Sequence, residues 1–180
     1  MNILDIAENS VNASAKSVSI LLDYLPDSKL ILVIEDDGIG MSQNTIDMVT
    51  DPFFTSRTSR KVGLGIPFLK MAAEMTGGSF SIKSEPGKGT VVKTEFWYEH
   101  IDMMPLGDIG STMSALISGN PATDFLFILR SRGNEFTLDS KEIKKILGGV
   151  SVETAEVAVF IREYTTEHVL NVLNNNLENT

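Results

Sequence analysis

The sequence contains no cysteine, which excludes disulfide bonds, thiolate metal sites and cysteine nucleophiles. Its two histidines, His100 and His168, are far apart in the chain and suggest no metal cluster. No apolar run approaches the roughly 18 residues that a membrane-spanning helix requires. The first ten residues include acids and lack the basic segment that opens a signal peptide. We therefore expect a cytoplasmic protein without a membrane partner.

Basic residues are also scarce. The chain has 15 Lys and Arg against 24 Asp and Glu, a net charge of −9, and both halves are acidic. This balance excludes a general platform for nucleic acid. Residues 55–61, TSRTSRK, are a local exception with three bases, four hydroxyls and no acid.

The periodicity of the first 100 residues predicts an α+β fold. Direct strand-to-strand neighbours and clustered helices favour a two-layer sandwich with a mixed, mainly antiparallel sheet. Repeated βαβ units are not indicated. The predicted helices are 2–16, a short one from a Ser42 cap to Val49, and one with Pro67 in its first turn that ends at Gly77-Gly78; the predicted strands are 17–24, 29–36, 79–84 and 90–98.

The sequence pattern changes after residue 100, where a loop-like stretch is followed by a new set of predicted elements. We therefore expect a domain over 1–100 and a small α+β extension over 101–180. The motifs of the extension point to no particular family, and it could either extend the sheet or form a partner surface. Its predicted elements are a helix at 111–118, a strand at 124–130 turned towards 135–138, a helix Lys141–Leu147 capped by Ser140, and a long helix at about 154–177 through Val157, Ile161, Tyr164, Val169 and Leu173.

Polar residues on the opening helix form the first candidate element of a site. Asp5, Asn9, Asn12 and Lys16 are four, three and four residues apart, which places them on one helical face. A solvated stripe is the alternative interpretation, because amphipathic helices usually have one.

The second element is EDDGIGM, residues 35–41. Asp36 ends a strand predicted to be buried, where a carboxylate needs a partner. Gly38 and Gly40 would let a ligand approach the backbone closely. A plain Asp-Gly turn is the alternative.

Three further stretches complete the set. The sequence DPFFTSRTSRK at 51–61 is either a phosphate-facing loop or a solvent loop with two core aromatics. The sequence VGLGIPF at 62–68 precedes a helix N-terminus, where free N–H groups favour anions, although two glycines more often mark a linker. The stretch GKGT at 87–90 is also explained by a hairpin turn.

In this order, the five elements resemble the GHKL superfamily of ATP-binding domains, which includes gyrase, heat-shock chaperones, histidine kinases and mismatch-repair proteins. DIAENSVNAS is similar to the N box and EDDGIGM to the first glycine box. DPFFTS is similar to the F box, VGLGIPF to the second glycine box and SEPGKGTVVKTEF to the closing hairpin. The resemblance covers residues 2 to about 98 and implies the Bergerat fold with ATP and Mg²⁺ as ligands.

The resemblance also implies roles for individual residues. Asp36 would accept from the adenine amino group, and Thr90 would support the same pocket. Asn9 would coordinate Mg²⁺, Asn12 would lie near the phosphates, and Asp5 would occupy the place of the catalytic residue. The remaining positions would be a wall beside adenine (Gly38, Ile39, Gly40, Met41), the lid (Thr55, Ser56, Arg57) and backbone donors to phosphate (Gly63, Leu64, Gly65).

The sequence departs from the superfamily pattern at several points. Asp5 stands where ATPase branches carry glutamate and many histidine kinases carry asparagine, and Lys61 stands where relatives often have glycine. Neither histidine lies in a helical hairpin typical of a phosphoacceptor, so we expect no autophosphorylation within this chain.

These features favour a Mg-ATP-binding, histidine kinase-like domain without its own phosphoacceptor domain. It would phosphorylate a partner protein or switch it with ATP. Two alternatives are a nucleotide-sensing module without catalysis and a protein-serine kinase of the anti-sigma type.

Overall fold

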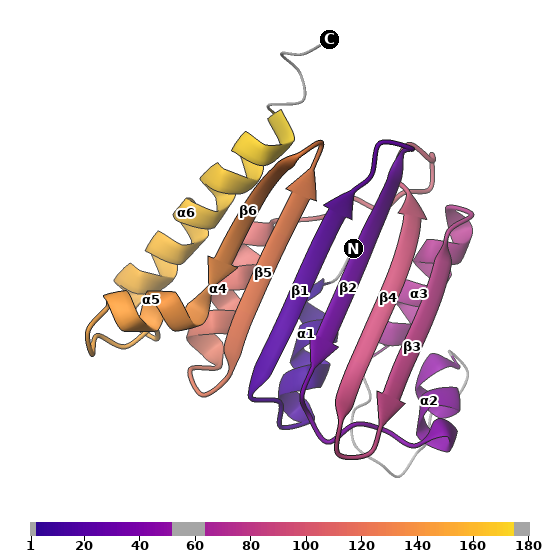
Figure 1. Cartoon of the computed structure of the whole chain (residues 1–180), viewed down its shortest axis with the longest axis horizontal. Helices are drawn as coiled ribbons and strands as arrows, with labels where there is room; N and C mark the ends of the chain where they lie inside the picture. Colours follow the sequence, from indigo (N-terminus) through magenta and orange to yellow (C-terminus); the bar gives the residue numbers. More distant parts are fainter. Residues whose placement is uncertain (1–2, 52–63, 175–180) are drawn as a thin grey trace.

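Six strands form one sheet, and helices α1, α3 and α4 cover one of its faces (Figure 1). The computed structural model describes residues 3–51 and 64–174. The strands are β1 Ser17–Tyr24, β2 Lys29–Asp36, β3 Ser79–Glu85, β4 Gly89–Trp97, β5 Asp124–Ser131 and β6 Asn134–Asp139. The helices are α1 Ile3–Asn12, α2 Gln43–Thr50, α3 Gly65–Met75, α4 Ile109–Gly119, α5 Ser140–Ile146 and α6 Ala155–Asn174.

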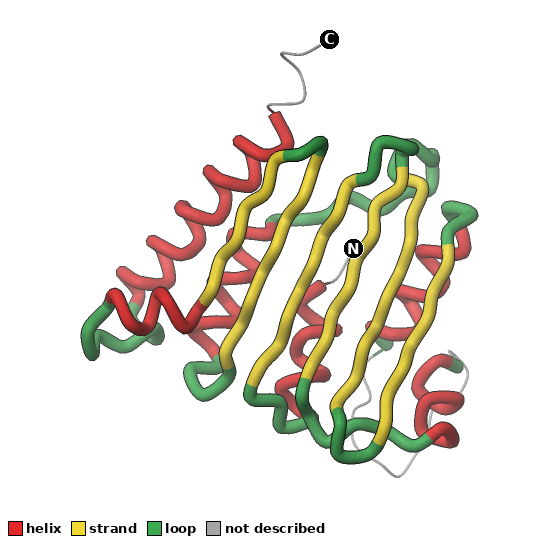
Figure 2. The backbone as a smooth tube through the Cα atoms, viewed as in Figure 1, coloured by secondary structure: helices red, strands yellow, loops and turns green. Residues whose placement is uncertain are grey.

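The strand order is β3-β4-β2-β1-β5-β6, visible as adjacent yellow segments in Figure 2. β1 pairs with β5 in parallel, and the other four pairings are antiparallel. The predicted α+β sandwich with a mixed, mainly antiparallel sheet is therefore confirmed.

Alternation along the strands builds the core. In β2, Leu30, Leu32 and Ile34 are at most 1% exposed, while the residues between them are more accessible. Since successive side chains of a strand point to opposite faces, this pattern directs one face into the helical layer.

The extension joins the same sheet. β5 pairs with β1 along its whole length, from Ser17 opposite Asp124 to Tyr24 opposite Ser131. Behind it, α4 packs tightly on α6, because a Cβ atom on Gly110 would lie only 2.1 Å from Thr166 Oγ1. Of the two roles considered for residues 101–180, extension of the sheet is thus observed.

Several predicted element boundaries were wrong. The first helix ends at Asn12 rather than 16, because the chain turns at Ser14, where φ is +61°. Asp139, not Ser140, caps α5 by accepting a hydrogen bond from Lys141 N. The buried hydroxyl of Ser140 instead accepts from Phe125 N at 2.8 Å.

The long helix α6 also differs from the prediction. Tyr164 is 38% exposed rather than buried in the core, and it lies against the rings of Phe136 and His168. Among the described residues, no helix combines the length and apolar character needed to cross a bilayer.

Candidate functional site

A cavity of ≈ 760 Å³ lies where the last turn of α1 meets the end of β2 and the start of β4; we call it the α1 cavity. In Figure 1 these element ends lie at the lower end of the sheet, and α2 contributes Thr45 and Val49 to the lining. Its lining combines an apolar majority with a few polar groups, as small-molecule sites do. The lining residues are Ile6, Asn9, Ser10, Asn12, Ala13, Ile34, Asp36, Ile39, Gly40, Met41, Thr45, Val49, Ile66, Thr90 and Val92.

The fold brings together residues from four of the five predicted elements around this cavity, since Ile66 of the VGLGIPF stretch also lines it. Gly38 lies just behind the wall, where its N–H donates to Asp36. Four predicted positions, Thr55, Ser56, Arg57 and Gly63, lie outside the described residues. The predicted residues that line the α1 cavity are Asn9, Asn12, Asp36, Ile39, Gly40, Met41 and Thr90.

Asp36 is the buried acid of the cavity, with 9% of its surface exposed. Ser10 Oγ, from α1, donates to its Oδ2 at 2.6 Å, and Gly38 N donates to its Oδ1 at 2.9 Å. These donors offset the loss of water around a carboxylate at the end of a core strand. They also fix the direction of its remaining acceptor sites.

Thr90 lies directly opposite Asp36 on β4, and Ser84 lies directly opposite Thr90 on β3. Ser84 Oγ is 2.9 Å from Thr90 Oγ1. Asp36, Thr90 and Ser84 therefore form a polar row across three neighbouring strands.

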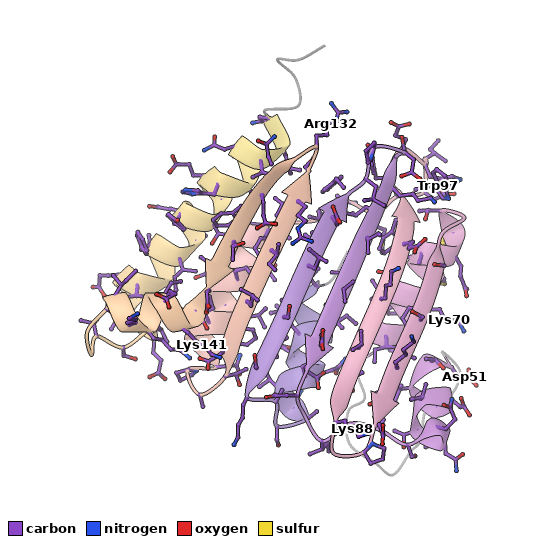
Figure 3. All side chains as sticks on the ribbon, viewed as in Figure 1. Asp51, Lys70, Lys88, Trp97, Arg132 and Lys141 are labelled. Atoms are coloured by element: carbon purple, nitrogen blue, oxygen red, sulfur yellow. The ribbon has the colours of Figure 1, made fainter. Side chains whose placement is uncertain are left out.

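The turn of the β3–β4 hairpin holds in place the loop of residues 37–41, which we call the glycine loop. Gly87 N donates to Ile39 O at 2.7 Å, and Met41 N donates to Ser84 Oγ at 2.8 Å. At Gly40, φ is +64° and a Cβ atom would lie 2.0 Å from Glu85 O, so this position requires glycine. The hairpin, whose tip carries Lys88 in Figure 3, is more than a turn, because it supports one wall of the cavity.

Asp37, the second acid of the loop, has a structural role. Its Oδ1 accepts from Lys16 N at 2.7 Å and Ser17 N at 2.9 Å, which joins the end of β2 to the start of β1. These backbone donors hold the pKa of its exposed carboxyl below the ordinary value of 3.8.

Asn9 brings an unsatisfied group to the cavity. Its side-chain Nδ2 is buried and has no hydrogen-bond partner within the described part of the chain. Buried polar atoms are normally paired, so an orphan in a cavity is a sign of a missing polar ligand. Asn12, one turn further along α1, is exposed at the end of the helix.

The start of α3 lies between two cavities. Gly65 is buried against α1, where an added Cβ atom would be 3.0 Å from Asp5 Cβ, so glycine allows the two helices to meet. Ile66 lines the α1 cavity, whereas Leu64 and Gly65 do not. Leu64 caps the helix without a side-chain hydrogen bond and is 49% exposed.

Asp5 faces the second of these cavities, which we call the α3 groove and which has a volume of ≈ 490 Å³. It is not among the lining residues of the α1 cavity. The catalytic role expected for it stays a prediction. The α3 groove is lined by Asp5, Gly65, Phe68, Leu69, Met71, Ala72, Met75, Asp102 and Met104.

Comparison with known proteins agrees with this geometry. Residues 2–100, more than half of the chain, match the family model described as "Histidine kinase-, DNA gyrase B-, and HSP90-like ATPase". The chain belongs to this family. It thus contains a histidine kinase-like ATPase domain, as the ordered motifs had suggested.

Individual relatives are similar over the same half of the chain. Sporulation kinase D of Bacillus subtilis is 37% identical over 92 residues, which is 50% of this chain and 18% of that protein. A putative sensor protein of Shewanella frigidimarina is 30% identical over 97 residues, covering 52% of this chain and 15% of the relative. The chain therefore spans less than a fifth of these relatives.

Among solved structures, the N-terminal domain of a DNA repair protein aligns with 75% of this chain and 50% of its own, at a TM-score of 0.50 and 14% identity. At that identity the likeness concerns the fold alone.

Sequence reasoning missed two hydroxyl residues of the ATPase domain. Ser10 follows Asn9 on α1 and is 4% exposed. It lies four residues after Ile6 and three after Ala7, so the helical spacing that places it on the buried face was the available signal. Ser84 pairs with Thr90 across the hairpin, and the short EPGKG turn could have predicted that register.

Proposed function

We propose that the histidine kinase-like ATPase domain binds Mg-ATP in the α1 cavity and that the chain uses it to phosphorylate, or to switch, a partner protein. The observation that carries the proposal is the Asp36 carboxylate. It is buried at the cavity wall, and both of its oxygens are oriented by protein donors.

The chemistry of this carboxylate favours adenine. An ionised carboxylate can only accept hydrogen bonds, and the adenine amino group donates them. Guanine places a carbonyl at the corresponding position, which a carboxylate repels. The apolar side chains Ile34 and Val92, which also line the cavity, would contact the faces of the base.

Asn9 fits the magnesium and phosphate end of the site. Mg²⁺ in nucleotide sites is held by few protein ligands together with substrate phosphates. The amide oxygen of Asn9 would supply one such ligand, and its orphan Nδ2 could donate to a phosphate oxygen. Within residues 3–51 and 64–174, no group of three His, Cys, Asp or Glu could hold an ion by itself, so substrate oxygens would complete the coordination.

The N-terminus of α3 would face the distal phosphates. Helix N-termini carry unpaired N–H groups and a positive partial charge, and Ile66 of the first turn lines the α1 cavity. Asp5 packs against Gly65 at this point, on the side of the α3 groove. A phosphoacceptor that enters through the groove would therefore meet Asp5 beside the distal phosphates, where Asp5 could accept its proton.

The α3 groove supports the partner in this proposal. Phe68, Met71 and Met75 on its wall are each about half exposed, and exposed apolar side chains gathered in one groove are typical of an interaction surface. Asp5 and Asp102 add acidic charge to the same groove. A segment of the phosphoacceptor protein with apolar side chains and a basic residue would fit this combination.

Names of relatives agree with phosphotransfer. Sporulation kinase D and the cell-division control histidine kinase of Brucella ovis are named as kinases, and the latter is 30% identical over 108 residues. This chain covers 18% and 10% of those proteins, so the activity of the whole relatives is part of the proposal.

One observation favours a second function, nucleotide sensing without catalysis. Asp5 lines the groove and not the α1 cavity, although the corresponding residue would need to approach the distal phosphate. In that case the bound nucleotide would only change the conformation of the chain.

The first test is calorimetric titration with Mg²⁺ and a non-hydrolysable ATP analogue. We expect binding by the wild type and a loss of about 100-fold in affinity for Asp36→Asn, since a neutral amide turns a donor towards the base. Asp124→Asn is the matched control, because Asp124 is a half-buried acid of the same sheet that pairs with Lys144 at 2.8 Å. Equal affinities of the Asp36 and Asp124 variants would refute the adenine site.

Transfer is tested separately with labelled ATP and candidate partner proteins. We expect Asp5→Asn to slow transfer and Met71→Glu to abolish it, with nucleotide binding retained in both. Nucleotide binding without transfer or hydrolysis would support the sensing function instead.

A further inference from the structure

The hydroxyl of Ser84 lies at the centre of a hydrogen-bond network behind the adenine wall. It is within hydrogen-bond distance of three groups: Met41 N at 2.8 Å, Gly89 O at 2.8 Å and Thr90 Oγ1 at 2.9 Å. Nothing in the proposed ATP-binding function yet uses this residue.

The direction of each bond follows from counting protons. A hydroxyl has one proton and two lone pairs. Met41 N can only donate to Ser84, and the carbonyl of Gly89 can only accept from it. The single proton of Ser84 is therefore committed to Gly89, and the contact with Thr90 must use the proton of Thr90.

Thr90 consequently presents only lone pairs to the α1 cavity. Asp36, directly opposite on β2, also presents only acceptors, since Ser10 and Gly38 donate to it. Two neighbouring strands thus place two acceptors side by side at the cavity wall. Residues directly opposite each other on paired antiparallel strands, as Asp36 and Thr90 are, have Cβ atoms about 5 Å apart. At this spacing one ligand group can reach both side chains.

We propose that Ser84 sets the base specificity of the nucleotide site by holding the Thr90 hydroxyl as an acceptor. This inference rests on the proposed ATP binding. The group that satisfies both acceptors is an exocyclic amino group with two N–H bonds, such as the 6-amino group of adenine. A 6-carbonyl, as in hypoxanthine or guanine, turns lone pairs towards both Thr90 and Asp36.

Ser84 acts through Thr90, so it is a positioning residue and not a group that contacts the base. It also holds the glycine loop through Met41, and its loss could weaken binding of every nucleotide. Base discrimination, measured as the ratio of two dissociation constants, separates these effects. A purely structural role would change both constants by the same factor.

The experiment measures binding of Mg-ATP and Mg-ITP, which differ at the 6-position, to the full chain. In the wild type we expect ATP to bind more tightly. In Ser84→Ala the Thr90 hydroxyl is free to rotate and donate to the ITP carbonyl, so the preference for ATP should fall by about 5- to 10-fold, the value of one hydrogen bond. Purine riboside triphosphate, which has hydrogen at this position, should be least affected.

Two further variants keep the test decisive if Ser84→Ala folds poorly. Thr90→Val removes the acceptor with little change in shape and should lower the preference for ATP by a similar factor. Ser84→Thr retains the hydroxyl and should restore the wild-type preference. Ser81→Ala, at an exposed position of the same strand, is the control and should change neither constant.

The outcomes are distinguishable from failure of the ATP site itself. If the wild type binds no ATP, the proposed function fails. If the wild type binds ATP and Ser84→Ala weakens ATP and ITP equally, the function stands and the specificity role of Ser84 is overturned.

Discussion

β2 and β5 flank β1 on opposite sides and share the same length and burial pattern, yet only β2 leads to a candidate site. Each strand has eight residues and alternates three buried apolar residues with more accessible ones. Each also ends with a buried polar residue, Asp36 in β2 and Ser131 in β5. Burial pattern alone therefore does not distinguish a ligand wall from a core strand.

The difference lies in strand direction and neighbours. β2 runs antiparallel to β1, so it ends where α1 finishes and where the β3–β4 hairpin turns. β5 runs parallel to β1 and ends at the opposite end of the sheet, before the turn marked by Arg132, far from Lys88 at the hairpin tip (Figure 3). A buried acid at the end of a strand can form a ligand site only if other elements orient it with hydrogen-bond donors and leave a cavity beside it.

The largest expected effect tests whether these two strands belong to one cooperative unit. Leu32→Ala in β2 and Leu129→Ala in β5 remove fully buried side chains, and each should lower the free energy of unfolding by about 3 kcal/mol. Trp97, the only tryptophan, lies in β4 and reports on the ATPase domain by fluorescence during urea unfolding. If Leu129→Ala left the Trp97 transition unchanged, the extension would unfold as a separate unit.

A second prediction compares two glycines with positive φ at opposite ends of the sheet. Gly40→Ala should cost about 2–3 kcal/mol and weaken nucleotide binding, since its Cβ would meet Glu85 O at 2.0 Å. Gly133→Ala should cost only about 1 kcal/mol, because nothing lies within 4 Å of its Cβ. Urea unfolding measures the loss of stability, and titration with nucleotide measures the loss of affinity. If Gly40→Ala and Gly133→Ala lowered the free energy of unfolding equally, the contact of Gly40 with the hairpin would not constrain the loop.

A third prediction separates binding from stability. Asn9→Ala removes an amide whose Nδ2 lacks a partner among the described residues, so it should leave stability unchanged while weakening Mg-ATP by about 30-fold. Asn120→Ala removes an amide that donates to Leu116 O at 3.0 Å, so it should cost about 1 kcal/mol of stability and leave binding unchanged. Thermal unfolding measures the stability of the two variants and calorimetry measures their affinity for Mg-ATP. The prediction fails if either variant changes both properties.

The smallest expected effect concerns pH. The folded-state pKa of Asp37 is lowered by backbone donors, so the stabilisation is present above about its ordinary pKa of 3.8 and is lost as pH falls through the lower folded value. Because the carboxylate of Asp37 is exposed and solvent weakens its hydrogen bonds, Asp37→Ala should cost only about 0.5 kcal/mol at pH 7, and the difference from wild type should shrink below pH 4. A constant difference across acid pH would rule out the ionised carboxylate as the cause.

Much of the fold followed from local patterns. Alternation identified strands 17–24 and 29–36 with the bounds that the structure shows, and Ser42 was correctly placed as the cap of α2. Helix ends were less predictable, since Asp139 and Ser140 are both able to cap and only packing against Phe125 decides between them.

The sequence by itself determined the family, the buried strands and the order of the motifs, because periodicity and glycine spacing are local properties. Tertiary structure alone decided that Ser10 and Ser84 support Asp36 and Thr90, since these partners come together only through helix packing and strand register. It also decided that β5 lies beside β1 and that Asp5 faces the α3 groove, because strand order and the closeness of α1 to α3 depend on contacts between distant parts of the chain.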